Sequence, residues 1–578
     1  MPSFVLIDQS LRSVGGHPFD YAVHILSAAQ QAGYKPVLAT HRKFNSRNAL
    51  PSQFRVLPCF RFSTYSKFAL YCSGAHLPRP LKGMGYPQEP QRRGKISSLL
   101  RAIWLWLYDQ ARERQLRAFA RTCSRLFDAL ELQPGDHVFF ATMSEFEFIA
   151  LSRYLGATKS ASNATWHLQF HFNIFEGRPA QYALQQERLD WVRKCLSFGM
   201  PKAICVSLNF YNTSQQLAEQ YNQIGLVEFK NLPYPVNPAI FPSGSASATP
   251  SPRPLRVTCA GGVRKEKGQK QLAKVLGSAW GQLFLSGKLQ LHVQSKPSHR
   301  NKLGLPTRQN ADGSSPIVFW PHPLSPEKYV EFIRESDIGL LLYDSKRYYA
   351  RRAGVLGEFL SAGIPVIVPS GCWLSEQIAE AGFAYLDEIN RMPSISETAD
   401  LDLGPFEISE QSPTEHILAV PPGASALLVT VTSRSWPPGS YLGVSVTKHR
   451  DSNTSTLPRS ETQVISCRRE WGPSRALWGL PDGQKTITLA TREEYASGRI
   501  LVDSMHVKWI KSSKSLPISA VGIAVADDAD VGVLLEEIAE HFEHYKSTAL
   551  KFSEIWRREH DPLKTVQHLI NCQPPSAP

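Results

Sequence analysis

The chain lacks the features that mark a secreted or membrane-spanning protein. Its first residues, MPSFVLIDQS, have neither the basic stretch nor the apolar core of a signal peptide. No apolar run approaches the ~20 residues that a membrane-spanning helix needs. The nine cysteines are odd in number, scattered and without a C-x-x-C pair, which favours reduced thiols. We therefore expect a cytoplasmic protein.

Positive charge is what the chain has in excess. Its 64 Lys and Arg outnumber 50 Asp and Glu, so the formal net charge is +14. Such an excess favours anionic partners, which include nucleotides, nucleic acid and anionic membrane surfaces. The 578 residues are too many for one core, so we expect about two to four domains. No DNA- or RNA-reading motif is present, and we expect no nucleic-acid partner.

The N-terminal part reads as a doubly wound α/β domain. A short apolar strand, the loop with Gly15 and Gly16, a helix from Pro18 and a second strand form a βαβ unit. The two glycines let a ligand approach the backbone closely. The alternating segment WHLQFHF predicts a strand that ends near His171, where open α/β sheets bind ligands. His171 is the candidate cleft residue, with His167 in reserve; a hydrogen-bonded core histidine is the alternative.

A second domain begins after a linker rich in Ser, Pro and Ala. A strand at 255–260 runs into GGVRKEKG, a glycine- and lysine-rich loop of the kind that binds phosphate. Arg264 and Lys267 in this loop would stabilise a leaving group that gains negative charge. Two such cations can replace a metal, and no residue cluster has the spacing of a metal site.

The segment RRAGVLGEFLSAGIPVIVP, at 351–369, reads as loop, helix, turn and strand. The free N–H groups at the start of a helix attract an anion, which places a phosphate at Ala353, Gly354 and Val355. Glu358 lies one helical turn deeper, where its carboxylate can accept hydrogen bonds from two neighbouring sugar hydroxyls. Phosphate site and hydroxyl acceptor together predict a nucleotide-sugar site.

The βα alternation stops near residue 387. From 388 to 515 short strands and Pro-Gly turns predict an all-β sandwich, and the apolar run at 521–525 then resumes the α/β pattern. The sandwich is therefore predicted as an insertion. Trp436, Trp471 and Trp478 would stack on sugar rings if it binds carbohydrate, or fill its core if it is a spacer.

A long helix is predicted at 95–130. Arg117, Arg121 and Arg125 follow one another at a spacing of one turn, downstream of an AIWLWLY run. Two interpretations stay open: the helix lies on an anionic bilayer, or the arginines form the solvated face of a packed helix.

In this order the motifs resemble those of GT-B glycosyltransferases, especially the retaining GT4 family. The resemblance covers nearly the whole chain except 388–515, and at the donor motif it rests on Ala353, Gly354, Val355, Leu356 and Glu358. The sequence departs from the family at Ala350, where many members have a Glu that contacts the donor sugar.

The resemblance implies an α/β GT-B fold with two Rossmann-like domains facing a cleft. The expected parts are an N-terminal acceptor-side domain at 1–241, a linker at 242–254, a C-terminal nucleotide-sugar-binding domain at 255–387 and 516–550, the inserted β-sandwich at 388–515, and a C-terminal helix and tail at 551–578 that return to the first domain.

The implied activity is transfer of a sugar from a nucleotide-diphosphate sugar to a hydroxyl of a glycan or lipid-linked acceptor, with retention. His171 would contact the sugar, Gly15 and Gly16 would line the cleft, and no cofactor or metal is expected. Alternatives are an epimerase or hydrolase acting on a sugar nucleotide, and an inactive carbohydrate-binding protein. We expect a cytoplasmic location, with peripheral membrane contact if the helix at 95–130 lies on a bilayer.

Overall fold

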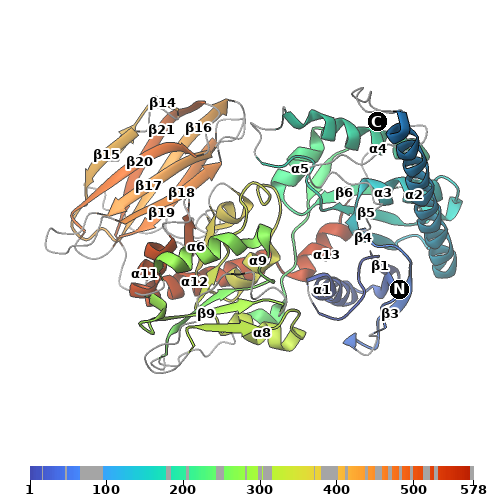
Figure 1. Ribbon diagram of the computed structural model, residues 1–578, viewed down its shortest axis with the longest axis horizontal. Coiled ribbons are helices and arrows are strands. Elements are labelled where there is room, and N and C mark those ends of the chain that lie inside the picture. Colours follow the sequence, from blue (N-terminus) through green and yellow to red (C-terminus); the bar gives the residue numbers. More distant parts are fainter. Residues whose placement is uncertain are drawn as a thin grey trace. The chain divides into compact units, whose positions relative to one another are not determined.

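The protein is described by a computed structural model. It describes residues 1–15, 17–45, 49–64, 95–177, 182, 184–203, 207–241, 253–279, 283–296, 303, 315–369, 372–378, 401–409, 414–436, 441–448, 459–466, 472–480, 484–494, 499–511, 521–525 and 531–572. The chain divides into two compact units, which are residues 1–176, 184–235 and 560–578 for unit 1, and 177–183 and 236–559 for unit 2 (Figure 1). Gly16 and most of the predicted linker, 242–252, lie outside the described residues.

Unit 1 contains a parallel sheet in the order β3-β2-β1-β4-β5-β6-β7. The strands are β1 (Ser3–Asp8), β2 (Lys35–His41), β3 (Arg55–Phe60), β4 (His137–Met143), β5 (Thr165–Phe170), β6 (Ser207–Asn212) and β7 (Phe229–Asn231). The helices are α1 (His17–Gln31), α2 (Lys95–Leu130), α3 (Glu145–Leu155), α4 (Gln186–Ala203), α5 (Gln215–Asn222) and α13 (Pro562–Ile570). The predicted doubly wound domain and its first βαβ unit are confirmed.

Two sequence predictions for unit 1 need correction. The apolar run at 203–207 predicts a strand with these bounds, and the bounds are wrong, because α4 extends to Ala203 and β6 begins only at Ser207; residues 204–206 lie outside the described part of the chain. Short apolar runs do not distinguish helix from strand, and this one led to the error. The polar face predicted for β5 is not solvated, since His167 and Gln169 are fully buried. The C-terminal helix α13 packs in the same core as α1, through Val566 and Leu569.

Six parallel strands of unit 2, in the order β10-β9-β8-β11-β12-β22, form one part of a ten-stranded sheet that continues beyond β22 into antiparallel strands of the inserted module. These six strands are β8 (Leu255–Cys259), β9 (Leu289–Gln294), β10 (Ile317–Trp320), β11 (Ile338–Leu340), β12 (Val366–Pro369) and β22 (Gly522–Val525). Helices α8 (Pro326–Arg334), α9 (Gly354–Ser361) and α12 (Phe542–Glu559) share one core, and α6 (Gln269–Ala279) and α11 (Val531–Glu540) share another. Helices thus cover both faces, as a parallel sheet requires.

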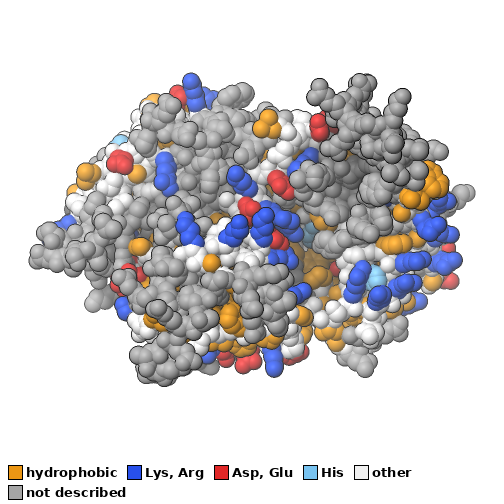
Figure 2. Space-filling view, in the orientation of Figure 1, with side chains coloured by type: hydrophobic (Ala, Val, Ile, Leu, Met, Phe, Trp, Pro, Cys, Tyr) orange, Lys and Arg blue, Asp and Glu red, His pale blue; other side chains and the backbone are white. Residues whose placement is uncertain are grey.

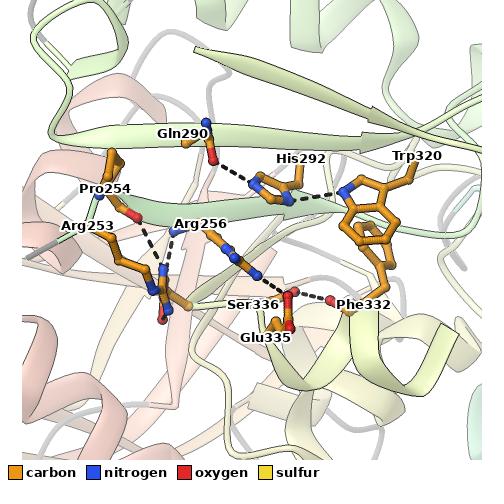
Figure 3. A network of polar contacts seen from close by, with 10 residues as sticks. Arg253, Pro254, Arg256, Gln290, His292, Trp320, Phe332, Glu335 and Ser336 are labelled. Atoms are coloured by element: carbon orange, nitrogen blue, oxygen red, sulfur yellow. Dashed lines mark hydrogen bonds and ion pairs between the residues drawn. The ribbon is translucent and has the colours of Figure 1, made fainter. Parts of the chain in front are cut away.

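Polar contacts join several strands of this sheet and a helix (Figure 3). Arg253 donates to both carboxylate oxygens of Asp337, at 2.6 and 3.1 Å, and so joins the residues that precede β8 and β11. Arg256 pairs with Glu335 at the end of α8. His292 accepts from the Trp320 indole at 3.0 Å and links β9 to β10. The amino ends of β8 and β11 are therefore held by ion pairs, which leaves their carboxyl ends for a ligand site.

The inserted module is an antiparallel β-sandwich, drawn in orange in Figure 1. Its strands are β13 (Leu401–Leu403), β14 (Phe406–Ile408), β15 (Thr414–Ala419), β16 (Ala426–Trp436), β17 (Tyr441–Lys448), β18 (Arg459–Ser466), β19 (Gly472–Gly479), β20 (Thr486–Glu494) and β21 (Arg499–Ile510). They lie in the chain between β12 and β22, which pair directly and in parallel. The sheet β13-β21-β16-β19 and the strands β18-β17-β20-β15 enclose one apolar core. The expected fold class, two Rossmann-like units with a sandwich inserted in the second, is confirmed.

The sandwich also corrects two sequence predictions. The apolar runs at 500–502 and 505–509 predict two short strands, but in the structure they form one strand, β21, whose pairing with β16 skips Asp503. The polar pair Asp503-Ser504 at this irregularity looks like a strand end in the sequence. Trp478 is fully buried, so it fills the core and does not present a ring to a sugar. Trp471 and the Trp436 side chain lie outside the described part of the chain.

Candidate functional site

The predicted residues of unit 2 meet where β8 and β11 end. These neighbouring parallel strands release their loops at the same edge of the sheet, where α/β proteins bind ligands. The loop after β8 carries Arg264 and Lys267, and the loop after β11 leads into α9. A Cβ atom built on Gly261 would lie 2.8 Å from Val355 Cγ2, so the loop after β8 contacts the first turn of α9.

Glycine is required in the first of these loops. Gly261 and Gly268 have φ of +80° and +82°, a region that L side chains rarely adopt. A Cβ atom on Gly261 would also lie 2.7 Å from Lys267 Nζ, and one on Gly268 would lie 2.3 Å from the Leu342 carbonyl oxygen. The glycines therefore let the loop fold tightly and bring the lysine amine back to the end of β8.

Lys267 is held at the centre of this edge. Its Nζ donates to the Gly261 carbonyl at 3.1 Å and lies 5.1 Å from the centre of the Tyr343 ring. Burial, with smaller contributions from Arg264 and Arg351, lowers the pKa of Lys267 to about 8, and Glu358 and Glu266 oppose the shift. A cation in such surroundings is stabilised by any anion that binds beside it.

The Tyr343 hydroxyl is a second indication of a ligand. It is buried and has no hydrogen-bond partner among the described residues. The Tyr343 hydroxyl oxygen would lie 3.7 Å from a Cβ atom built on Gly261, so the hydroxyl lies beside the loop that carries Lys267. Buried hydroxyls without a partner are costly, and a bound polar group would satisfy this one.

Arg264 is paired with a neighbouring carboxylate. Its Nε forms an ion pair with Glu266, and its side chain is about half exposed. Burial would raise the pKa of Glu266, but its own backbone N–H, Arg264, Arg347 and Arg351 together lower it. Part of the arginine charge is thus compensated, and Lys267 is the stronger candidate for contact with an anion.

Helix α9 begins without a side-chain cap. Ala353 occupies the N-cap position in an extended conformation and has no oxygen with which to bond the first N–H groups. The Ala353, Val355 and Leu356 side chains are buried in the core, and the Leu356 N–H donates to the Ala353 carbonyl. What the start of α9 offers a ligand is therefore its backbone, including the amides of Gly354 and Val355.

Glu358 is oriented by a residue that the sequence analysis did not identify. The Tyr329 hydroxyl, from α8, donates to Glu358 Oε2 at 2.5 Å. The two residues are 29 positions apart, and no motif marks Tyr329. Glu358 is partly exposed, and the tyrosine fixes one of its carboxylate oxygens.

The predicted residues of unit 1 lie at the carboxyl end of its own sheet. His171 follows β5 directly, and its Nε2 is 2.6 Å from the Ala141 carbonyl and 3.1 Å from Gln169 Oε1. Gly15 has φ of +85° in the loop between β1 and α1. His167 is instead a core residue, since its Nε2 is 3.0 Å from His137 Nδ1 and burial lowers its pKa well below the usual value.

Two buried acids at the same edge of unit 1 were not predicted as site residues. Burial raises the pKa of Asp8, at the end of β1, to about 6. Burial raises the pKa of Glu147 to about 7, although hydrogen bonds with Ser144 oppose this. The sequence SEFE at 144–147 predicts a capping box at the start of a helix, and the structure confirms it, since Ser144 and Glu147 form this box at the start of α3. The motif identified the helix start but carries no information about burial.

Comparisons with known proteins give distant structural likenesses. No family model matches the chain, and no curated protein matches it significantly. Solved structures that are similar to this chain include WaaG, "a glycosyltransferase involved in lipopolysaccharide biosynthesis". Its sequence identity is 14%, the match covers 65% of this chain and 84% of that chain, and the TM-score is 0.37. The trehalose-6-phosphate synthase OtsA has 12% identity, 68% and 92% covered, and a TM-score of 0.43. Sucrose-phosphate synthase from Thermosynechococcus elongatus has 14% identity, 65% and 84% covered, and a TM-score of 0.38. At this distance no activity is transferred to the chain, and the function has to be argued from its own site.

Proposed function

We propose that the protein is a GT-B glycosyltransferase that moves a sugar from a nucleoside-diphosphate sugar to a hydroxyl acceptor. The observation that carries this proposal is the convergence, at one sheet edge of unit 2, of Lys267, the uncapped start of α9 and Glu358. A cation with free backbone amides suits a diphosphate, and a carboxylate one turn deeper suits a ribose.

The diphosphate would lie against Lys267 and the amides of Gly354 and Val355, with Arg264 as a second cation. In the transfer, the bond from the anomeric carbon to the diphosphate oxygen breaks, and a bond to the acceptor oxygen forms. The diphosphate leaves with the electron pair of the broken bond, and its departing oxygen takes up the proton that the acceptor hydroxyl loses. Cations beside the departing oxygen stabilise the charge that develops on it, so the proposal needs no metal or cofactor.

Glu358 would accept hydrogen bonds from the ribose hydroxyls, held in place by Tyr329. Ala350 is buried and offers no carboxylate to the donor sugar, so that contact has to come from other residues. In unit 1 we assign the sugar contact to His171 and the lining of the donor cleft to Gly15 and Gly16. The acceptor would be a glycan or a lipid-linked sugar, and retention is proposed from the resemblance to GT4 enzymes.

The first test is a titration of the protein with UDP, GDP, ADP and CMP. We expect one diphosphate to bind clearly better than the others, because a single base pocket selects one base. Glu358→Ala should weaken that binding about tenfold or more, since hydrogen bonds to a charged group contribute roughly 1.5–3 kcal/mol. Glu331→Ala is the matched control, because Glu331 is an exposed carboxylate on α8. Absence of binding to all four nucleotides would refute the proposal.

Transfer itself is tested by product analysis with the nucleotide sugar that matches the preferred base. A transferase should turn the donor over only when an acceptor with free hydroxyls is present. Efficient conversion of the donor alone would instead identify the protein as a hydrolase or an epimerase.

A further inference from the structure

Helix α2 presents a row of basic and apolar side chains away from the core of unit 1. Trp106 and Leu107 are 61% and 54% exposed, which is unusual for large hydrophobic side chains. The arginines that follow them are exposed as well. We call this surface the basic stripe, and it consists of Trp106, Leu107, Arg114, Arg117, Arg121 and Arg125.

Helical geometry places the whole basic stripe on one side. At about 100° per residue, all six side chains fall within an arc of about 100°. The opposite side of the helix carries the buried residues Leu116, Phe119, Cys123, Leu126 and Phe127. Phe119 packs near Phe60 and Phe140, and Phe127 packs against Trp166. The helix is therefore anchored by one face and leaves the basic stripe uncovered.

The charge of the stripe is only partly compensated by nearby acids. Glu113 lies 3.4 Å from Arg117 but is shared with Arg153, which it contacts at 2.8 Å. Asp128, near the end of α2, accepts from Ser124 at 3.1 Å and is exposed. In Figure 2, Lys and Arg side chains gather over α2, with a hydrophobic patch at one end of the row. Among the described side chains of α2, four exposed arginines therefore outnumber Glu113 and Asp128, and the stripe is positive.

We propose that the basic stripe docks the protein on an anionic lipid surface. The arginines would pair with lipid phosphates and Trp106 and Leu107 would enter the boundary between headgroups and acyl chains, as in helices that lie on membranes. Duplex nucleic acid fits the arginines, but its bases are already stacked, and its charged surface offers Trp106 and Leu107 no apolar environment. Docking on a lipid surface explains why apolar and basic residues share one exposed arc of the helix. Among the described residues no helix is both long and apolar enough to span a membrane.

The test is co-sedimentation of the protein with vesicles of phosphatidylcholine that contain about one third phosphatidylglycerol. Each arginine near an anionic surface strengthens binding about fivefold, which corresponds to about 1 kcal/mol. The triple variant Arg117→Gln, Arg121→Gln, Arg125→Gln should therefore bind about 100-fold more weakly. The control carries the same loss of charge at exposed cations of unit 2, as Lys288→Gln, Arg499→Gln, Lys511→Gln. The control should bind like the unmodified protein.

The apolar end of the stripe is tested separately. Trp106→Ala with Leu107→Ala should weaken vesicle binding and make the remaining binding more sensitive to salt, because only screened charge pairs are left. Equal binding by the stripe and control variants, equal binding to pure phosphatidylcholine, or binding to duplex DNA in place of vesicles would overturn the proposal. None of these variants touches the nucleotide site, so the nucleotide titration and the vesicle experiment succeed or fail independently.

Discussion

Replacing Lys267 by methionine separates its role in binding from its role in the fold. Methionine keeps the length and apolar stem of the side chain while it removes the charge. In the folded chain burial lowers the pKa of Lys267 to about 8, from 10.5 in the unfolded chain. At neutral pH that difference corresponds to a cost of about 3 kcal/mol at most for keeping the amine charged. Lys267→Met should therefore leave the folded state as stable as before, or make it more stable.

The same substitution should weaken nucleoside-diphosphate binding. A charged hydrogen bond contributes roughly 1.5–3 kcal/mol, so we expect the dissociation constant to rise about 10- to 100-fold. Calorimetric titration measures the affinity, and denaturant unfolding measures the stability. Lys265→Met is the matched control, because Lys265 lies on the same short helical turn with an exposed side chain. It should change neither quantity appreciably.

The pH dependence gives a readout that a structural role would not change. Lys267 is charged below its pKa of about 8 and loses its charge as the pH rises through that value. The affinity of the unmodified protein for the diphosphate should therefore fall between about pH 7.5 and 9.5, whereas that of Lys267→Met should stay nearly level. If the variant keeps full affinity, or shows the same decline with pH, Lys267 does not contact the diphosphate.

Two further predictions concern residues that the structure identified. Tyr329→Phe removes the hydroxyl that holds Glu358, so the affinity for the nucleoside diphosphate should fall about 5- to 10-fold. In competition titrations the preference for ribonucleotides over 2′-deoxynucleotides should also become smaller. An unchanged preference would show that Glu358 does not bind the ribose. Burial raises the pKa of Asp8 from 3.8 to about 6, so its carboxyl stabilises the fold below pH 3.8 and this contribution is lost as the pH rises to about 6. Asp8→Asn should therefore raise the free energy of unfolding by up to about 3 kcal/mol at pH 7 and by little near pH 4, as measured by denaturant unfolding at both pH values; an equal effect at the two pH values would refute the burial argument.

The sequence predicted most of the elements, because local patterns carry that information. Period-two and period-3.6 hydrophobic patterns predicted β1, β2, β4 and β5 of unit 1, the six parallel strands of unit 2 and the 36-residue helix α2, whereas β3 and β7 were not predicted. The change of composition after residue 387 and the apolar run near 521 predicted an insertion, and the parallel pairing of β12 with β22 confirms it. Errors occurred where an apolar run was too short to have a period, as before Ser207, or where a register shift interrupted a strand, as in β21.

What the sequence by itself determined is the set of residues with the right chemistry and their places at strand and helix ends. Gly261, Lys267 and the start of α9 follow from local motifs, since glycine loops and helix starts bind anions by short-range geometry. Only the tertiary structure decided which partners these residues have. Tyr329 reaches Glu358 from another helix, and α13 packs in the core beside α1 from the far end of the chain. Burial and pairing depend on segments distant in sequence, and so do the pKa shifts of Lys267 and Asp8; no local pattern encodes them.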